Sequence, residues 1–133
     1  MEKIHRILIV DDDKDQRLLF INLLKGCDVI IDEVGDPLVA IEMIDQNSYD
    51  IAIVDLMFKF SIADGVDIVK FIRKKAQQTF IICCTGFSEI NSGFMNDIDA
   101  FLLKPVDFGN LRCTLNKCCT DKKIKYINEP AII

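Results

Sequence analysis

Three consecutive aspartates, Asp11 to Asp13, directly follow the apolar run ILIV near the start of the chain. Adjacent carboxylates repel one another, and burial makes it still harder to ionise them. Such acids either turn into water or gather around a cation, and Mg²⁺ suits them because it prefers oxygen ligands. The residue types therefore predict a metal site at the end of this run, with solvated acids as the alternative.

Three further polar side chains close later apolar runs: Asp55 after IAIV, Thr85 after FIICC and Lys104 after FLL. A charged residue that closes a buried strand needs a partner. Towards a phosphoryl group, a lysine offers a point charge and a hydroxyl offers a hydrogen bond. An aspartate beside a divalent cation can act as a nucleophile and form an acyl phosphate. Together these residues predict phosphoryl transfer to a carboxylate.

Apolar runs alternate five times with helical patterns, and these elements must position the polar residues. The expected strands cover residues 7–10, 29–33, 51–54, 80–84 and 100–103. Helices are expected at residues 14–25, 37–45, from 64 or 65 onward, and after 107, with Asp13, Asp36, Asp64 and Asp107 as their respective caps. Strands and helices in this alternation form a parallel sheet with helices on both faces. Ligands bind such sheets beyond the carboxyl ends of the strands, where the aspartates, Thr85 and Lys104 are expected to meet.

The composition narrows the class of protein. The chain has 133 residues, half of them hydrophobic and 28% charged, as expected for one soluble globular domain. Its formal net charge of -5 argues against a nucleic-acid-binding surface, which usually has a basic face. No apolar run approaches the roughly 18 residues of a membrane span, and the N-terminus lacks an apolar signal core. We therefore expect a cytoplasmic protein without membrane or nucleic-acid contacts.

The six cysteines and the single histidine exclude several kinds of site. The cysteines include two adjacent pairs and no CxxC, which gives neither a zinc pattern nor a redox motif. Cys83 and Cys84 lie inside an apolar run and are predicted to be small core residues in a reducing compartment. With His5 as the only histidine, a His-rich metal site and a Ser-His-Asp triad are excluded.

The sequence resembles a receiver domain of the two-component response-regulator family. Four motifs carry the likeness: Asp11-Asp12, Asp55, Thr85-Gly86 and Lys104-Pro105, each after its apolar run. The resemblance implies an α/β fold of flavodoxin-like (βα)5 type, a doubly wound five-stranded parallel sheet in the order 2-1-3-4-5. It also implies a receiver domain at residues 1–120, followed by a tail at residues 121–133 without an output domain.

The resemblance implies a metal-dependent phosphoacceptor site. Asp55 would accept the phosphoryl group from a phosphohistidine of a histidine kinase or a histidine phosphotransfer protein. Asp12 would bind Mg²⁺ directly, with Mn²⁺ as a possible substitute, and Asp11 would act mainly through a bound water. Asp55 itself and the backbone carbonyl of Met57 would complete the metal ligands. Asp13 is instead expected to cap the following helix.

The resemblance also implies how the phosphorylated state is sensed. Lys104 would pair with Asp55 and then with the phosphoryl group, and the Lys104-Pro105 bond would be cis. Thr85 would move to bind a phosphoryl oxygen, and Phe101 would turn inward behind it as an aromatic switch, although it also suits a plain core position. The side chains of Met57 and Phe87 orient a hydrolytic water poorly, which predicts slow self-dephosphorylation, although the small Gly86 leaves solvent access to Asp55.

Several alternatives stay open at this stage. A small Mg²⁺-dependent phosphatase of the haloacid-dehalogenase type would use Asp11 as its nucleophile, but it would leave Asp55 without a role. The domain is expected to be either a stand-alone response regulator or the receiver of a hybrid histidine kinase, and a monomer or weak dimer that signals to a downstream protein. The loop after Asp55 is two residues longer than usual in the family, and the segment between Thr85 and Lys104 is short.

Overall fold

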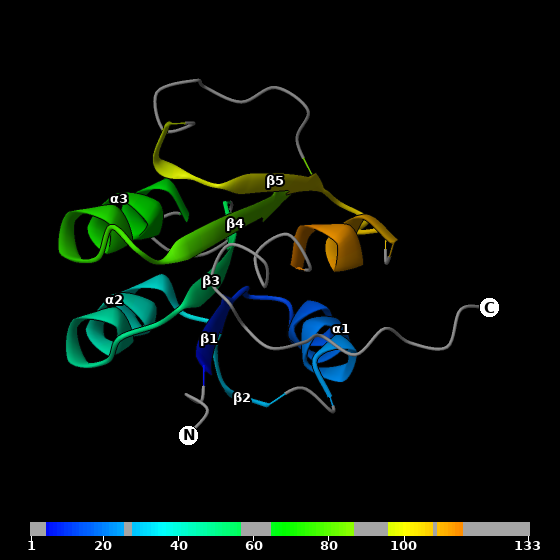
Figure 1. The fold of residues 1–133 in the computed structure, drawn as a ribbon, viewed down its shortest axis with the longest axis horizontal. Helices are drawn as coiled ribbons and strands as arrows, with labels where there is room; N and C mark the ends of the chain where they lie inside the picture. The colour runs from blue at the N-terminus through cyan, green and yellow to red at the C-terminus, as the bar shows by residue number, and fades with distance from the viewer. Residues whose placement is uncertain (1–4, 26–27, 57–64, 87–95, 108, 116–133) are drawn as a thin grey trace.

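Five parallel strands form one sheet in the computed structural model, in the order β2-β1-β3-β4-β5 (Figure 1). The structure describes residues 5–25, 28–56, 65–86, 96–107 and 109–115. The strands are β1 (His5–Val10), β2 (Val29–Val34), β3 (Ile51–Asp55), β4 (Phe80–Thr85) and β5 (Ala100–Leu103). The helices are α1 (Lys14–Leu23), α2 (Pro37–Gln46) and α3 (Gly65–Lys75), and residues 109–115 are also helical. The predicted fold and strand order are confirmed, with the reversal of strand order between β1 and β3.

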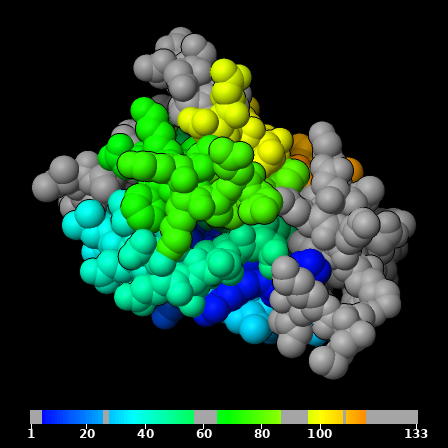
Figure 2. Space-filling view, turned by 60° about the vertical axis from the view of Figure 1, so that its left-hand side comes forward, coloured from blue at the N-terminus to red at the C-terminus, as the bar shows by residue number. Residues whose placement is uncertain are grey.

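Helices cover both faces of the sheet because successive strand residues point to opposite sides. Ile7 and Ile9 of β1 pack on the side of α1 and residues 109–115. Leu8 and Val10 pack on the side of α2 and α3. Figure 2 shows α2 and α3 next to each other over that second face. The residues of ILIV that point to either face of the sheet are therefore all buried, as the unbroken apolar sequence of this run predicts.

Local sequence signals explain where the helices begin. The Asp13 carboxylate accepts a hydrogen bond from the Asp15 amide at 2.9 Å, so Asp13 caps α1 as predicted. Asp36 caps α2 in the same way, through the Leu38 amide at 2.8 Å, ahead of Pro37 at the first helical position. The predicted cap at Asp64 lies outside the described residues.

The buried side of α1 differs in part from the prediction. The helical spacing predicts that Leu19, Leu23 and Leu24 face the core; Leu24 is fully buried and the half-buried Leu23 packs against the core, as predicted. The other fully buried side chain is Phe20, which the spacing did not predict, and Leu19 is only half-buried. The aromatic ring of Phe20 offers the largest apolar surface on the helix, and its burial sets the rotation of α1 against the sheet.

None of the helices in the described ranges is long and apolar enough to cross a bilayer.

Cys83 and Cys84 are free thiols buried in β4, which confirms their prediction as core residues. Burial raises the pKa of the Cys84 thiol to about 12 and raises the pKa of Cys83 as well, so both thiols are neutral.

Candidate functional site

The predicted site residues meet at the carboxyl-terminal edge of the sheet. Asp11 follows β1, Asp55 and Thr85 end β3 and β4, and Lys104 follows β5. Backbone hydrogen bonds continue past the strand ends here: the Asp11 amide donates to Val34 O at 3.1 Å, and the Lys104 amide donates to Thr85 O at 2.7 Å. The sheet itself therefore fixes the backbone from which these side chains leave.

Three carboxylates form an acidic cluster at this edge. Asp11, Asp12 and Asp55 each offer an oxygen atom, and these oxygens lie within 4.8 Å of one another. Asp11 and Asp55 are only 1% and 5% exposed, whereas Asp12 is exposed. The Asp13 amide donates to Asp11 Oδ1 at 2.9 Å, so the Asp11 carboxylate has a fixed orientation. A set of hard oxygen donors with one side open to solvent fits Mg²⁺, which keeps several of its waters.

The Lys104 ammonium joins the two buried carboxylates. Its Nζ lies 2.9 Å from Asp11 Oδ2 and 3.3 Å from Asp55 Oδ1. Burial is the largest influence on Lys104 and lowers its pKa, but the hydrogen bonds and charges of Asp11 and Asp55 outweigh it and raise the pKa above its ordinary value. Lys104 is therefore a fixed cation at neutral pH. The sequence-based expectation paired it with Asp55, and the structure adds the shorter contact to Asp11.

The remaining predicted residues have different surroundings. Thr85 is buried at the end of β4, beside the cluster. Phe101 in β5 is half-buried and packs against the core on the α2 and α3 side. The Lys104-Pro105 peptide bond is cis, as the resemblance implies. Met57 and the rest of the loop after Leu56 lie outside the described residues, as does Phe87.

Two residues near the site were not singled out from the sequence for any role in it. Gly65 was expected only at the start of a helix, yet it lies against the backbone of Asp55. Arg17 is an ordinary helix residue in the sequence, yet its guanidinium donates to the Asp11 carbonyl oxygen at 2.7 Å. A lysine or arginine four residues after a cap that follows an acidic pair is one signal that points to such a contact, because it lies one helical turn from the strand end.

A comparison with known families identifies this arrangement. The family model described as the response regulator receiver domain matches residues 7–116. The chain belongs to this family. The acidic cluster is of the kind at which receiver domains bind Mg²⁺, and Asp55, which the haloacid-dehalogenase alternative leaves without a role, lies within it.

Solved receiver domains share the fold. A signal receiver domain of an HD domain-containing protein from Pseudomonas fluorescens Pf-5 has a TM-score of 0.82 and 20% identity, covering 91% of this chain and 98% of that one. The response regulator TrrA from Thermotoga maritima, solved in complex with Mg²⁺ and BeF, has a TM-score of 0.76 and 27% identity, covering 86% of this chain and 99% of that one.

Curated relatives are longer proteins. The transcription factor SKN7 of Candida albicans is 32% identical over 135 residues, which are 98% of this chain and 23% of that protein. The transcriptional regulatory protein ZraR of Escherichia coli O157:H7 is 25% identical over 130 residues, which are 95% of this chain and 29% of that protein. This receiver domain therefore spans less than a third of the length of either relative.

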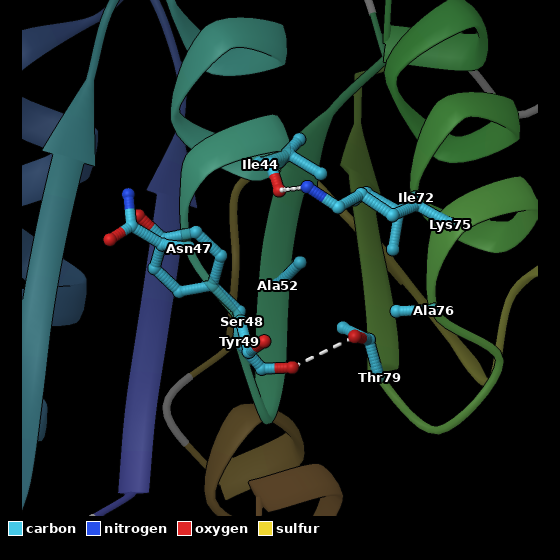
Figure 3. A pocket seen from close by; sticks show the side chains of 9 residues that line it. All are labelled: Ile44, Asn47, Ser48, Tyr49, Ala52, Ile72, Lys75, Ala76 and Thr79. Atoms are coloured by element: carbon cyan, nitrogen blue, oxygen red, sulfur yellow. Dashed lines mark hydrogen bonds between the residues drawn. The ribbon is translucent and has the colours of Figure 1, made fainter.

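A cavity lies at the end of the α2 and α3 layer that is opposite the acidic cluster (Figure 3). Its volume is about 70 Å³, and its lining is mostly apolar or neutral: Ile44, Asn47, Ser48, Tyr49, Ala52, Ile72, Lys75, Ala76 and Thr79. The one charged group among these, the Lys75 ammonium, donates to the Ile44 carbonyl at 2.8 Å. The Thr79 hydroxyl donates to the Tyr49 carbonyl at 2.8 Å. These polar groups are used to hold α2, α3 and β4 together and leave no reactive set facing the cavity.

Proposed function

We propose that this receiver domain takes a phosphoryl group from a phosphohistidine onto Asp55. The observation that carries the proposal is the convergence on Asp55 of a cation and two further carboxylates. Lys104 Nζ lies 3.3 Å away, and oxygens of Asp11 and Asp12 lie within 4.8 Å. The Asp55 carboxylate is buried at the end of a strand, next to the Lys104 ammonium and to two further carboxylates that can bind a metal ion. This arrangement suits in-line attack of Asp55 on a phosphoryl group.

Asp11, Asp12 and Asp55 would hold Mg²⁺ or Mn²⁺, together with the backbone carbonyl of Met57. When bound, the ion supplies positive charge that offsets the carboxylates and the incoming phosphoryl oxygens. The donor set supports this assignment because all its side-chain ligands are carboxylate oxygens and one of them is exposed to solvent.

The chain's own residues account for the transfer. A carboxylate oxygen of Asp55 attacks phosphorus, the P–N bond to the histidine breaks, and its electron pair returns to the imidazole nitrogen. An acyl phosphate results, with one new P–O bond. The Lys104 ammonium balances charge on the phosphoryl oxygens, and the Thr85 hydroxyl donates to one of them after it moves. Phe101 turns inward behind Thr85, so that phosphorylation of Asp55 changes the surface of β5.

The phosphoryl donor would be a histidine kinase or a histidine phosphotransfer protein, and the receiver would signal to a downstream protein. The domain serves either as a stand-alone regulator or as part of a longer chain, and it is a monomer or weak dimer in the cytoplasm. The absence of direct nucleic-acid contacts stays a prediction from the net charge, since the longer relatives are named as transcription regulators. Met57 and Phe87 predict that the phosphoryl group is lost slowly; a half-life of seconds in purified protein would contradict this.

The test is to incubate the protein with Mg²⁺ and a small phosphodonor. We expect a stoichiometric phosphoprotein that is stable in acid and labile in base, and that is absent in Asp55→Asn. Asp13→Asn is the matched control, because asparagine also caps helices and Asp13 is a cap rather than a member of the acidic cluster. Multiple turnover that survives in Asp55→Asn and disappears in Asp11→Asn would support the phosphatase instead.

A further inference from the structure

Arg17 of α1 connects the ends of two strands beside the acidic cluster. Its Nη1 donates to the Asp11 carbonyl oxygen at 2.7 Å, and its Nε lies 2.9 Å from Glu33 Oε1 in β2. The Arg17 side chain is only 16% exposed, whereas Glu33 is 42% exposed. The guanidinium is therefore fixed by two hydrogen bonds of different kinds, and the shorter of them reaches the backbone of a cluster residue.

The contact with Asp11 is directed at a structurally important group. The Asp11 carbonyl belongs to the rigid peptide plane that joins Asp11 to Asp12. Asp11 is held elsewhere through its amide, which donates to Val34 O, and through its carboxylate, which accepts from the Asp13 amide and from Lys104. The hydrogen bond from Arg17 also fixes the carbonyl of Asp11, and with it the orientation of the peptide plane that leads to the exposed Asp12.

Gly35 provides the space for this contact. A Cβ atom at Gly35 would lie 3.0 Å from Arg17 Nη1 and 3.6 Å from the Asp11 carbonyl oxygen. A side chain at this position would therefore press on the guanidinium at the point where it meets Asp11. Glycine after β2 leaves room for the arginine tip, which is a second observation that the contact is built into the fold.

We propose that Arg17 is a positioning residue for the metal site formed by the acidic cluster. It fixes the peptide between Asp11 and Asp12 so that both carboxylates are arranged to bind a divalent cation. This inference rests on the proposed function of the acidic cluster. A purely electrostatic role makes the opposite prediction. A cation this near the cluster repels Mg²⁺, so its removal would tighten Mg²⁺ binding if charge alone mattered. Loss of a positioning contact weakens Mg²⁺ binding.

The experiment measures Mg²⁺ affinity by titration calorimetry on the full chain, without a phosphodonor. We expect Arg17→Met to weaken Mg²⁺ binding roughly tenfold, as loss of outer-shell support does in metal sites. Glu33→Gln is the matched control, since it removes the ion pair and leaves the contact with Asp11, and we expect near wild-type affinity. Arg17→Lys keeps the charge and should restore only part of the loss. In phosphorylation assays, Arg17→Met should raise the Mg²⁺ concentration for half-maximal rate and leave the rate at saturating Mg²⁺ much less affected.

Unchanged or tighter Mg²⁺ binding by folded Arg17→Met would overturn the proposal, as would a loss in Glu33→Gln equal to that in Arg17→Met. If Arg17→Met does not fold, Gly35→Ala decides, because it displaces the guanidinium and keeps its charge: weaker Mg²⁺ binding supports the proposal and unchanged binding overturns it. Wild-type protein that neither binds Mg²⁺ nor accepts a phosphoryl group would contradict the proposed function itself. Wild-type protein that does both, beside an unaffected Arg17→Met, contradicts the positioning role alone.

Discussion

Gly65, the first residue of α3, lies directly against the backbone of Asp55. A Cβ atom on Gly65 would be 2.0 Å from the Asp55 carbonyl oxygen and 2.4 Å from Leu56 Cα. The Gly65 amide also donates to the Leu56 carbonyl at 3.1 Å. The start of α3 therefore packs against the end of β3 without an intervening side chain, and any larger residue at position 65 must push the proposed phosphoacceptor aside.

We expect Gly65→Ala to lower the free energy of unfolding by about 3 kcal/mol, the upper range for overpacking, because the clash is with backbone. The gain in helix propensity, roughly 1 kcal/mol, cannot offset it. Urea unfolding measures the change. Gly86→Ala is the matched control, since a Cβ at Gly86 meets no atom within 4 Å. Similar unfolding midpoints for the two variants would contradict the close contact.

Lys104 is a cation that lies between Asp11 and Asp55, at 2.9 and 3.3 Å from their oxygens. Lys104→Met should therefore make the cluster more negative and tighten Mg²⁺ binding by roughly tenfold, even with screening by solvent. The same change should slow phosphorylation of Asp55, since the phosphoryl oxygens lose a counter-charge. Titration calorimetry and phosphorylation rates measure the two effects.

Lys70→Met provides the control for the Lys104 variant. Lys70 is exposed on α3, so its removal changes the net charge equally without touching the cluster. We expect wild-type Mg²⁺ affinity and phosphorylation for Lys70→Met. Weaker Mg²⁺ binding in Lys104→Met would show that the lysine organises the carboxylates more than it repels the ion, against the expectation here.

Much of this fold follows from the sequence because its signals are local. The run ILIV is buried on both faces, and the caps Asp13 and Asp36 begin their helices, since each depends on neighbours within a few residues. The rotation of α1 could not be read in the same way. Leu19 and Phe20 are consecutive in an unbroken apolar run, so periodicity alone does not say which of them is buried, and packing against the sheet decides.

The site shows the same division. Asp11, Asp55, Thr85 and Lys104 come together because parallel strands bring their carboxyl ends to one edge, a property of topology alone. The close approach of Gly65 and the contact of Arg17 depend on three-dimensional packing between elements separated in the chain. The close approach of Gly65 leaves no periodic or spacing signal, and the contact of Arg17 leaves only its four-residue spacing from the cap Asp13, so the sequence predicts the reactive groups and not their support.

Lys75 holds the end of α2 from the neighbouring helix. Its Nζ donates to the Ile44 carbonyl at 2.8 Å (Figure 3). It also donates to the carbonyl of Asp45. A cation at the carboxyl end of a helix satisfies free carbonyls and complements the helix dipole. We expect Lys75→Met to lower the free energy of unfolding by about 1 kcal/mol, measured in urea. The exposed neighbour Lys74, changed to Met, should have little effect; equal losses would show that only helix charge matters.

The described cysteines should differ sharply in reactivity. Cys83 and Cys84 are buried in β4, and burial raises the pKa of Cys84 to about 12, so their thiolates are scarce in the native state. Cys113 is exposed on the helix of residues 109–115. Iodoacetamide at pH 8 should therefore modify Cys113 in native protein and reach Cys83 and Cys84 only after unfolding, as located by peptide mass spectrometry. Because a raised thiol pKa means that the folded state binds the extra proton, the stability that the Cys84 thiol contributes is complete below its ordinary pKa, near 9, and is lost as the pH rises towards 12. Rapid modification of Cys84 in the native protein at pH 8 would contradict this prediction. It would mean that β4 opens to solvent next to Thr85, and that the backbone of the site is less rigid than its buried contacts indicate.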